Sequence, residues 1–318
     1  MKTCRVGRTG LKVSEVCLGT MTFGHQCDER TSFAILDKAT EAGVTFLDTA
    51  DVYPVPPTPE TAGRTEEIIG KWLHGKRDRF VLATKCRMRV GHGPNDEGLS
   101  RRHILQAADN SLRRLRTDFI DLYQTHSPDP DTPPEETLRA FDDLVRQGKV
   151  RYIGSSTLPA WQVVEAQWTA RYSGLHHFIS CQEEYSLLAR GMDRDMMPVL
   201  EAYGLGLIPF RPLADGLLTG KYRRGAPLPT GSRLGKMPRT AGRYMSDEIW
   251  SAVERLEGFA FERGHTLLEL ALNWLLQRPA VASVIAGATT PEQVEQNIRA
   301  AGWTLSEDDM QEIDRLTP

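Results

Sequence analysis

Four side chains capable of acid–base chemistry each follow a short apolar run in this sequence. Asp48 and Tyr53 lie in FLDTADVY, Lys85 ends VLATK, and His126 ends YQTH. In βα proteins, polar residues just beyond the carboxyl end of a strand face the ligand. A phenol in water has a pKa of about 10, and a nearby cation lowers that value by favouring the phenolate. The four residues therefore predict a proton-transfer site with Tyr53 as the general acid.

The roles of the other three residues follow from their charges. Lys85 is the cation expected to lower the pKa of Tyr53, and Asp48 is expected to keep Lys85 charged and oriented. His126 is expected to hydrogen-bond the substrate oxygen. Each residue alone also has a structural explanation: a rim tyrosine, a helix cap, a surface lysine or a loop histidine. Their shared position at four predicted strand ends favours the chemical interpretation.

The elements that position these residues alternate along the chain. Apolar runs of strand length are followed by amphipathic helical stripes, and Gly43 and Gly148 supply helix ends. Eight such strand–helix units in 318 residues fit a (β/α)8 TIM barrel better than a doubly wound sheet. A GxGxxG fingerprint after the first strand is absent, which weakens the Rossmann alternative further.

Three features depart from this repeat. Residues 1–15 predict a β-hairpin that plugs one end of the barrel. Phe210–Tyr244 predicts a long irregular segment, followed by two extra helices before the last strand. A final helix is predicted to start at Ser306, where Asp309 completes a capping box. No change of composition marks a linker, so we predict a single domain over residues 1–318.

The composition narrows the classes of partner. The net charge is −3 and no run of eighteen apolar residues occurs, which indicates neither a nucleic-acid nor a membrane partner. The start of the chain, MKTCRVGRTG, lacks a secretory apolar region. The five cysteines are scattered without a CxxC pair, which supports neither a disulfide framework nor a zinc site. We therefore expect a reduced, cytoplasmic protein without a metal; its oligomeric state is open.

Several motifs make the chain similar to the aldo-keto reductase superfamily over nearly its whole length. They are, in order, GRTGLKVSEVCLGTMTFG, FLDTADVY, LATKCR, SLRRLRTDFIDLYQTH, GKVRYIGSST, CQEEYSLL, PLADGLLTGKY and IAGATTPEQVEQN. The chain most resembles a bacterial branch with the inserted segment YPVPPTPETAGRTEE, and it is also similar to actinobacterial sugar-pathway reductases and to potassium-channel β subunits. The resemblance implies a barrel that binds a nicotinamide dinucleotide without a Rossmann domain. It also implies an NADP(H)-dependent reductase of a small-molecule aldehyde, ketone or keto sugar, with Asp48, Tyr53, Lys85 and His126 as catalytic residues.

The resemblance also implies the residues that contact the cofactor. Ser156, Thr157 and Gln182 are expected near the carboxamide, although Thr157 replaces the usual asparagine. Phe210 is expected to stack on the nicotinamide ring, and Arg211 replaces the usual serine beside it. Further contacts are expected after the first strand, after Phe210 and at the final strand–helix turn: Gly19, Thr20, Met21, Pro212, Leu213, Lys221, Arg233, Gly287, Thr289, Gln293 and Asn297.

The choice between NADPH and NADH depends on the cations of Lys221–Arg243, which holds seven cations and no acid. A solvated loop explains most of them; a loop over the barrel mouth could instead clamp a pyrophosphate. The resemblance implies that a lysine-serine pair and an arginine usually bind the 2′-phosphate, and this chain has Gly287, Ala288 and Gln293 at those places. Arg233 and Thr289 are expected to replace those groups, so NADPH should be preferred.

Alternatives remain open at this point. A barrel of this type could serve as a cofactor-sensing regulatory or interaction subunit, or Lys85 could form a Schiff base in a lyase. The insertion Pro54–Thr61, which contains four prolines, either walls the substrate pocket or forms a surface loop. His25 could also line the pocket.

Overall fold

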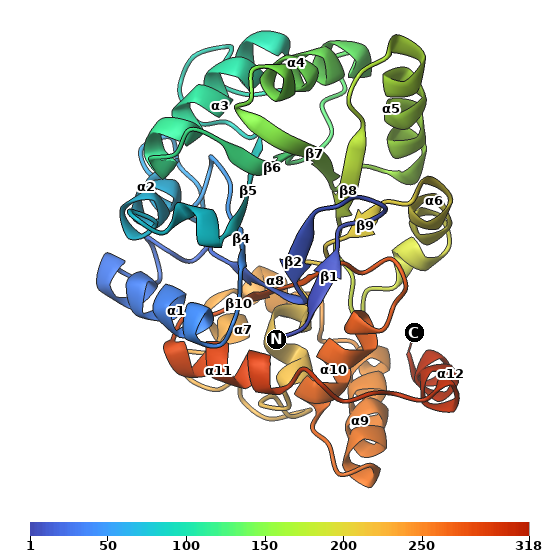
Figure 1. Cartoon of the computed structure of the whole chain (residues 1–318). Coiled ribbons are helices and arrows are strands. Elements are labelled where there is room, and N and C mark those ends of the chain that lie inside the picture. The colour runs from blue at the N-terminus through green and yellow to red at the C-terminus, as the bar shows by residue number, and fades with distance from the viewer. Residues whose placement is uncertain (318) are drawn as a thin grey trace.

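The computed structural model of the chain describes residues 1–317 (Figure 1). Eight parallel strands stand in the order β10-β3-β4-β5-β6-β7-β8-β9 around a central axis. The Leu207 N–H donates to the Ala280 carbonyl at 2.7 Å, and the Ala282 N–H to the Leu207 carbonyl at 2.8 Å, which closes the ring beside β9. The predicted (β/α)8 barrel is confirmed. Its strands are β3 Val16–Gly19, β4 Phe46–Asp48, β5 Val81–Cys86, β6 Ile120–Thr125, β7 Val150–Ser156, β8 Phe178–Gln182, β9 Gly206–Leu207 and β10 Val284–Gly287.

Helices surround the strands (Figure 1). The helices that follow strands are α1 Glu29–Glu41, α2 Arg64–Trp72, α3 Arg101–Leu115, α4 Pro134–Arg146, α5 Ala160–Ser173, α6 Met196–Tyr203 and α11 Pro291–Arg299. The additional elements are α9 Asp247–Glu262, α10 Leu267–Leu276, α12 Glu307–Leu316 and the 3-10 turns η1 Arg77–Arg79 and η2 Gly191–Asp193. Side-chain caps start several helices, and Ser306 with Asp309 forms the predicted capping box of α12. None of these helices is long and apolar enough to cross a membrane, within the residues that the structure describes.

The N-terminal hairpin covers one end of the barrel, as predicted. It consists of β1 Thr3–Arg5 and β2 Lys12–Ser14, and Figure 1 shows it across the barrel axis. Val6 and Val13 are fully buried against side chains inside the barrel. Gly7 has φ +56°, and a Cβ there would lie 2.4 Å from the Gly204 carbonyl oxygen, so the hairpin approaches the barrel too closely for a side chain.

The prediction that Phe210–Tyr244 is irregular is wrong in part. The segment contains η3 Ala214–Thr219, α7 Arg233–Lys236 and α8 Pro238–Gly242. Ser232 accepts a hydrogen bond from the Gly235 N–H at 3.3 Å and so caps α7. These elements have four to six residues, too few for a repeating apolar stripe to indicate them.

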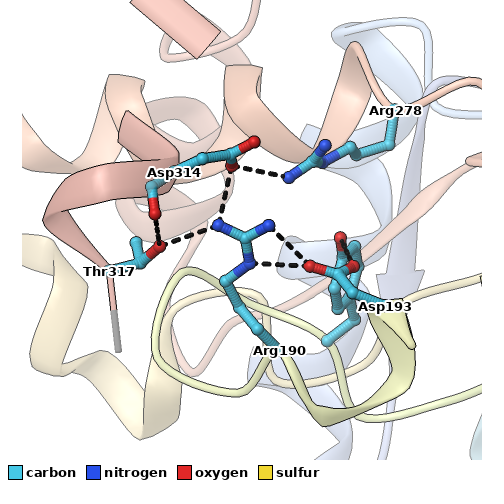
Figure 2. A network of polar contacts seen from close by, with 6 residues as sticks. Arg190, Asp193, Arg278, Asp314 and Thr317 are labelled. Carbon is cyan, nitrogen blue, oxygen red and sulfur yellow. Dashed lines mark hydrogen bonds and ion pairs between the residues drawn. The ribbon is translucent and has the colours of Figure 1, made fainter. Parts of the chain in front are cut away.

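A polar network fastens the last helix to the barrel (Figure 2). Arg190, in the loop after β8, donates to Asp314 Oδ1 and to Thr317 Oγ1, both at 2.7 Å. Arg278 donates to the same Asp314 oxygen at 2.9 Å, and Asp193 binds Arg190 from the other side at 2.6 Å. Three distant parts of the chain therefore meet at two guanidinium groups.

Candidate active site

A buried ion pair lies at the carboxyl ends of β4 and β5. Lys85 Nζ donates to Asp48 Oδ1 at 2.6 Å and to the Thr49 carbonyl at 2.9 Å. The Lys85 side chain is fully buried and that of Asp48 is 4% exposed. Burial alone would lower the pKa of the Lys85 ammonium, but the charge of Asp48, and that of Tyr53 once it is ionised, outweigh burial and the pKa is raised. Lys85 therefore stays protonated.

Tyr53 and His126 lie over this pair. The Lys85 ammonium is 5.1 Å from the centre of the Tyr53 ring, and the Tyr53 and His126 ring centres are 5.7 Å apart in an edge-on arrangement. The structure thus brings together all four residues that the sequence predicts. Burial raises the pKa of Tyr53, while the positive charge of Lys85 lowers it in part. Lys85 therefore lowers the pKa of Tyr53 as expected, but in the protein alone burial raises that pKa by more.

His126 is held in its neutral form. Burial, together with the positive charges of Lys85 and Arg87, lowers its pKa to about 3. Its Nδ1 is buried without a hydrogen-bond partner among residues 1–317. Neutral imidazole has one N–H donor and one acceptor, so His126 is able to donate to a carbonyl oxygen. Arg87 was not predicted; its place two residues after Lys85 in LATKCR is the signal that could have indicated it.

Two glutamines complete the surroundings of Asp48. Its Oδ2 accepts from Gln182 Nε2 at 2.8 Å and from Gln124 Nε2 at 3.4 Å. Gln182 was expected at the carboxamide; its amide nitrogen is instead turned to Asp48, which leaves its amide oxygen without a donor within the described chain. Gln124 was not predicted. It lies opposite Lys85 in the sheet and two residues before His126, so strand alternation directs it inward.

Ser156 and Thr157 lie at the end of β7. Ser156 is buried, while Thr157 is exposed and has φ +54°. A β-branched residue is strained in this left-handed region, where asparagine is far better tolerated. Thr157 Oγ1 donates to the His126 carbonyl at 3.1 Å, and its N–H donates to the Gln182 carbonyl at 3.1 Å. Thr157 therefore joins the ends of β6, β7 and β8.

The residues at the end of β3 and directly after it make contacts that stabilise the fold itself. A Cβ on Gly19 would lie 2.7 Å from the Ile285 side chain, so Gly19 permits close strand packing. Thr20 Oγ1 donates to the Asp48 carbonyl at 2.8 Å. The Met21 carbonyl accepts from the Val55 N–H at 3.0 Å, which ties the proline-rich insertion to this loop.

The proline-rich insertion begins directly after Tyr53, and the chain that follows the insertion is hydrogen-bonded to Tyr53. The Tyr53 carbonyl accepts from the N–H groups of Gly63 at 3.2 Å and Thr65 at 3.4 Å. Pro54 is buried, whereas Pro56 and Pro57 are exposed. The root of the insertion is therefore fixed beside Tyr53. His25, by contrast, lines a surface cleft of about 330 Å³ whose lining includes none of the four catalytic candidates.

A cluster of arginines and acids holds the long loop after β9. Phe210 is half-buried, and its N–H donates to the Glu183 carbonyl at 2.9 Å. Arg211 and Arg243 both bind Glu184, at 3.2 Å and 3.0 Å. The second acid, Asp215, is buried. The sequence did not indicate that Arg211 pairs with Glu184. The positive charge of the loop is offset in part by Glu184 and Asp215, which precede the Lys221–Arg243 segment.

Arg233 faces that second acid. Its Nε lies 2.8 Å from Asp215 Oδ1, and the Tyr244 hydroxyl donates to Asp215 Oδ2 at 3.1 Å. No hydrogen bond within residues 1–317 uses the two Nη groups of Arg233, so they remain for a ligand. Of the other predicted contacts in this loop, Pro212 is buried, Leu213 directly precedes η3, and Lys221 is exposed.

The final strand–helix turn is open at its surface. A Cβ on Gly287 would meet only the Gly19 carbonyl oxygen, at 3.9 Å. Gln293 Oε1 accepts from the N–H and the hydroxyl of Thr289, at 2.8 Å and 3.1 Å. Asn297 donates to the Gly287 carbonyl at 3.4 Å. Gln293 and Asn297 therefore bind the turn itself in the protein alone.

A second group of buried acids supports the active-site loop. Asp51 follows three residues after Asp48, and neither of its carboxylate oxygens has a partner within the described chain. Burial and the charge of Glu66 raise the pKa of Asp51 well above its ordinary value. Glu66 itself binds Arg114 at 2.7 Å and Thr84 at 2.6 Å. One arginine thus serves two buried acids, and burial together with the charge of Glu66 outweighs its lowering effect on the pKa of Asp51.

The arrangement suits proton transfer beside a flat ring. Tyr53 is a donor with a fixed cation behind it, and His126 is a neutral donor with a free ring nitrogen. Half-buried Phe210 offers a ring face, and the amide oxygen of Gln182 is an acceptor for a carboxamide. These groups fit a nicotinamide dinucleotide at the carboxyl ends of the strands.

Comparisons with known proteins agree with this geometry. The model of the aldo/keto reductase family matches residues 15–318. The chain is 37% identical to the uncharacterized oxidoreductase YrpG of Bacillus subtilis, over 100% of this chain and 96% of that protein. It is 39% identical to a probable voltage-gated potassium channel subunit beta of Oryza sativa (94% and 91%) and 33% identical to L-glyceraldehyde 3-phosphate reductase of Escherichia coli O157:H7 (97% and 90%). The chain belongs to the aldo/keto reductase family of oxidoreductases.

Proposed function

We propose that this protein is an NADP(H)-dependent reductase of an aldehyde, a ketone or a keto sugar, with Tyr53 as the general acid. The observation that carries the proposal is the buried Lys85–Asp48 pair, at 2.6 Å, beneath the rings of Tyr53 and His126. When bound, the nicotinamide would supply the hydride. The protein supplies the proton and the orientation of the carbonyl group.

The proton comes from the Tyr53 hydroxyl. As the carbonyl oxygen gains negative charge, His126 in its neutral form donates a hydrogen bond and fixes the direction of approach. Loss of the proton leaves a phenolate at Tyr53, and the ammonium of Lys85 stabilises that charge in a site with little water. Asp48 holds the ammonium in place through its Oδ1, while Gln182 and Gln124 hold its Oδ2.

Tyr53→Phe tests this assignment because it removes the proton donor and keeps the ring. Oxidation of NADPH with a generic aldehyde should fall about 10²–10⁴-fold, while the affinity for NADPH changes little. Tyr203→Phe, on half-buried Tyr203 of α6, is the matched control and should keep full activity. Activity of Tyr53→Phe within a few fold of the original protein would refute the role of Tyr53.

NADPH is proposed as the preferred cofactor because Arg233 has two Nη groups free for a phosphate. A charge-assisted, bidentate contact contributes roughly 1.5–3 kcal/mol, which is about a tenfold to hundredfold preference. Arg233→Ala should weaken NADPH binding by that factor and leave NADH nearly unchanged, in titrations of nicotinamide fluorescence. Lys236→Ala, on exposed Lys236 in the same short helix, is the control.

Other results would redirect this second proposal. If both cofactors weaken equally in Arg233→Ala, then Arg233 grips the shared pyrophosphate or orders the loop around Asp215. Equal affinity of the original protein for NADH and NADPH would remove the preference altogether.

A regulatory subunit is the second candidate function, favoured by 39% identity to a protein named as a probable potassium channel subunit beta. Steady turnover of NADPH with an aldehyde separates the two, since a subunit that only senses the cofactor would oxidise one equivalent and stop. A Schiff-base lyase is disfavoured because the raised pKa of Lys85 keeps its amine protonated.

A further inference from the structure

Helix α5 exposes three large aromatic side chains to solvent. Trp161, Trp168 and Tyr172 are 64%, 56% and 94% exposed. With Glu165, they stand four, three and four residues apart, which places them on one face of the helix. Figure 1 shows α5 on the outside of the barrel, between α4 and α6. The opposite face carries buried Val163, so the aromatic stripe is not needed for the core.

The exposed area of these three residues is large enough to form the centre of an interface. A large aromatic side chain buries about 150–250 Å² when it is covered, so the three offer roughly 300–500 Å² at their observed exposures. A specific interface buries about 800 Å² on each partner, and tryptophan, tyrosine and arginine dominate its binding energy. The stripe therefore supplies about half of one side of an interface, and the surrounding polar residues can supply the rest.

The charges along this face of α5 are complementary to those of a second copy of α5 that runs antiparallel to it. Glu165 and Arg171 stand on either side of Trp168, three residues away in each direction. Neither of them takes part in an ion pair within the part of the chain that the structure describes. If an antiparallel copy of α5 is placed with Trp168 on the two-fold axis, Glu165 lies opposite Arg171 of the copy, and Arg171 opposite Glu165. Tyr172 then lies opposite half-exposed Val164 of the copy.

We propose that α5 is the interface of a two-fold symmetric homodimer. Two copies of Trp168 pack on each other at the axis, and two equivalent Glu165–Arg171 ion pairs flank them. Such an isologous contact is self-complementary, because each residue meets its counterpart in both directions. The guanidinium of Arg171 already lies 5.5 Å from the Trp168 ring of its own chain, so its charge is placed beside the axis. The occupant of the surface is therefore a second copy of this chain.

Sedimentation velocity of the full chain, over concentrations from nanomolar to near-millimolar, tests the interface. The original protein should show a concentration-dependent dimer. Trp168→Ala should raise the dissociation constant by about tenfold or more. Phe261→Ala is the matched control, because Phe261 is an 81% exposed aromatic residue on α9, and it should leave the dissociation constant unchanged.

Exchange of the two charges distinguishes a weakened dimer from a misfolded protein. Glu165→Arg and Arg171→Glu should each weaken the dimer, because each places two like charges across the axis. The double variant Glu165→Arg/Arg171→Glu restores both pairs and should return the dissociation constant to within a few fold of the original. All of these variants should retain their oxidoreductase activity.

Three results would overturn the proposal. The first is a monomer at every concentration, including the case in which the monomer instead binds phosphatidylcholine vesicles through α5. The second is a dimer that Trp168→Ala does not weaken. The third is a double variant whose dimer dissociates as readily as that of either single variant.

Discussion

Burial raises the pKa of Tyr53, and Lys85 is the residue that opposes this rise most strongly. Its charge lowers the pKa of the phenol, and the charge of Asp48 raises that pKa by a smaller amount. Replacement by Lys85→Met should therefore raise the pKa of Tyr53. Because the proposed role of Tyr53 as general acid requires a protonated phenol, the alkaline limb of kcat/KM for reduction should move to higher pH. Lys12→Met, on the exposed Lys12 of β2, is the control.

The single variant leaves a carboxylate buried without its partner, so a double variant is useful. Asp48→Asn/Lys85→Met removes both charges. Because Lys85 acts on Tyr53 more strongly than Asp48 does, the alkaline limb should still move upward, by less than in Lys85→Met. An alkaline limb at its original pH in both variants would contradict the coupling.

Glu183 should make the protein less stable as the pH rises. Burial raises the pKa of its carboxyl to about 8, opposed by the backbone N–H groups of Thr157 and Leu158. Between the ordinary glutamate pKa and about 8, the unfolded chain has lost this proton while the folded chain keeps it. The stabilising contribution is therefore complete at low pH and is lost as the pH rises through that window, by up to about 1.4 kcal/mol per pH unit.

The neutral variant Glu183→Gln should remove this dependence. Urea unfolding should show it to be more stable than the original protein at pH 8 and little changed at pH 4.5. Glu262→Gln, on an exposed acid of α9 without an ion pair in the described part of the chain, is the control and should have the original profile. A constant difference between Glu183→Gln and the original protein at all pH values would contradict the raised pKa.

At the scale of elements, two helical glycines should respond in opposite directions to the same change. Gly70 lies in α2, where a Cβ would meet the Arg114 carbonyl oxygen at 2.2 Å and the backbone of Leu115 at 2.7 Å. Gly258 lies in α9, with nothing within 4 Å of an added Cβ. Alanine is better than glycine in a helix by about 1 kcal/mol.

Gly258→Ala should therefore stabilise the protein by up to about 1 kcal/mol. Gly70→Ala should destabilise it by about 1–3 kcal/mol, because α2 must move away from the end of α3. Equilibrium unfolding in urea measures both. Stabilisation by Gly70→Ala would show that the two helices separate without cost.

The alternation of strands and helices could be predicted because each strand–helix unit repeats the same apolar spacing. The four strand-end residues of the active site follow from that alternation, since parallel strands bring their carboxyl ends together. The sequence could not indicate that Gln182 turns to Asp48, or that Arg233 faces Asp215. Those contacts join residues 134 and 18 positions apart, and the second depends on a positive φ at Asp215 that no glycine marks.

At the scale of the whole molecule, Asp314 determines how α12 attaches to the barrel. Its Oδ1 accepts from both Arg190 and Arg278 (Figure 2). Asp314→Asn would leave two guanidinium groups facing each other without a carboxylate between them. We expect a loss of about 1–2 kcal/mol in the free energy of unfolding, with a smaller loss at high salt.

Asp308→Asn is the matched control for this prediction. Asp308 is exposed in the first turn of the same helix and should contribute less than about 1 kcal/mol, through the helix dipole alone. Equal effects of the two variants, measured by urea unfolding, would indicate that the network adds nothing beyond the general charge of α12.

The pairing of β10 with β3 has a consequence for how the chain is made. Val284 is the register partner of Val16, so the first barrel strand acquires its second neighbour only after nearly the whole chain has been synthesised. During translation one side of β3 is an unpaired edge, and such edges are prone to pair with other chains. Released chains that end before residue 284 should therefore associate with chaperones, and the released full chain should not.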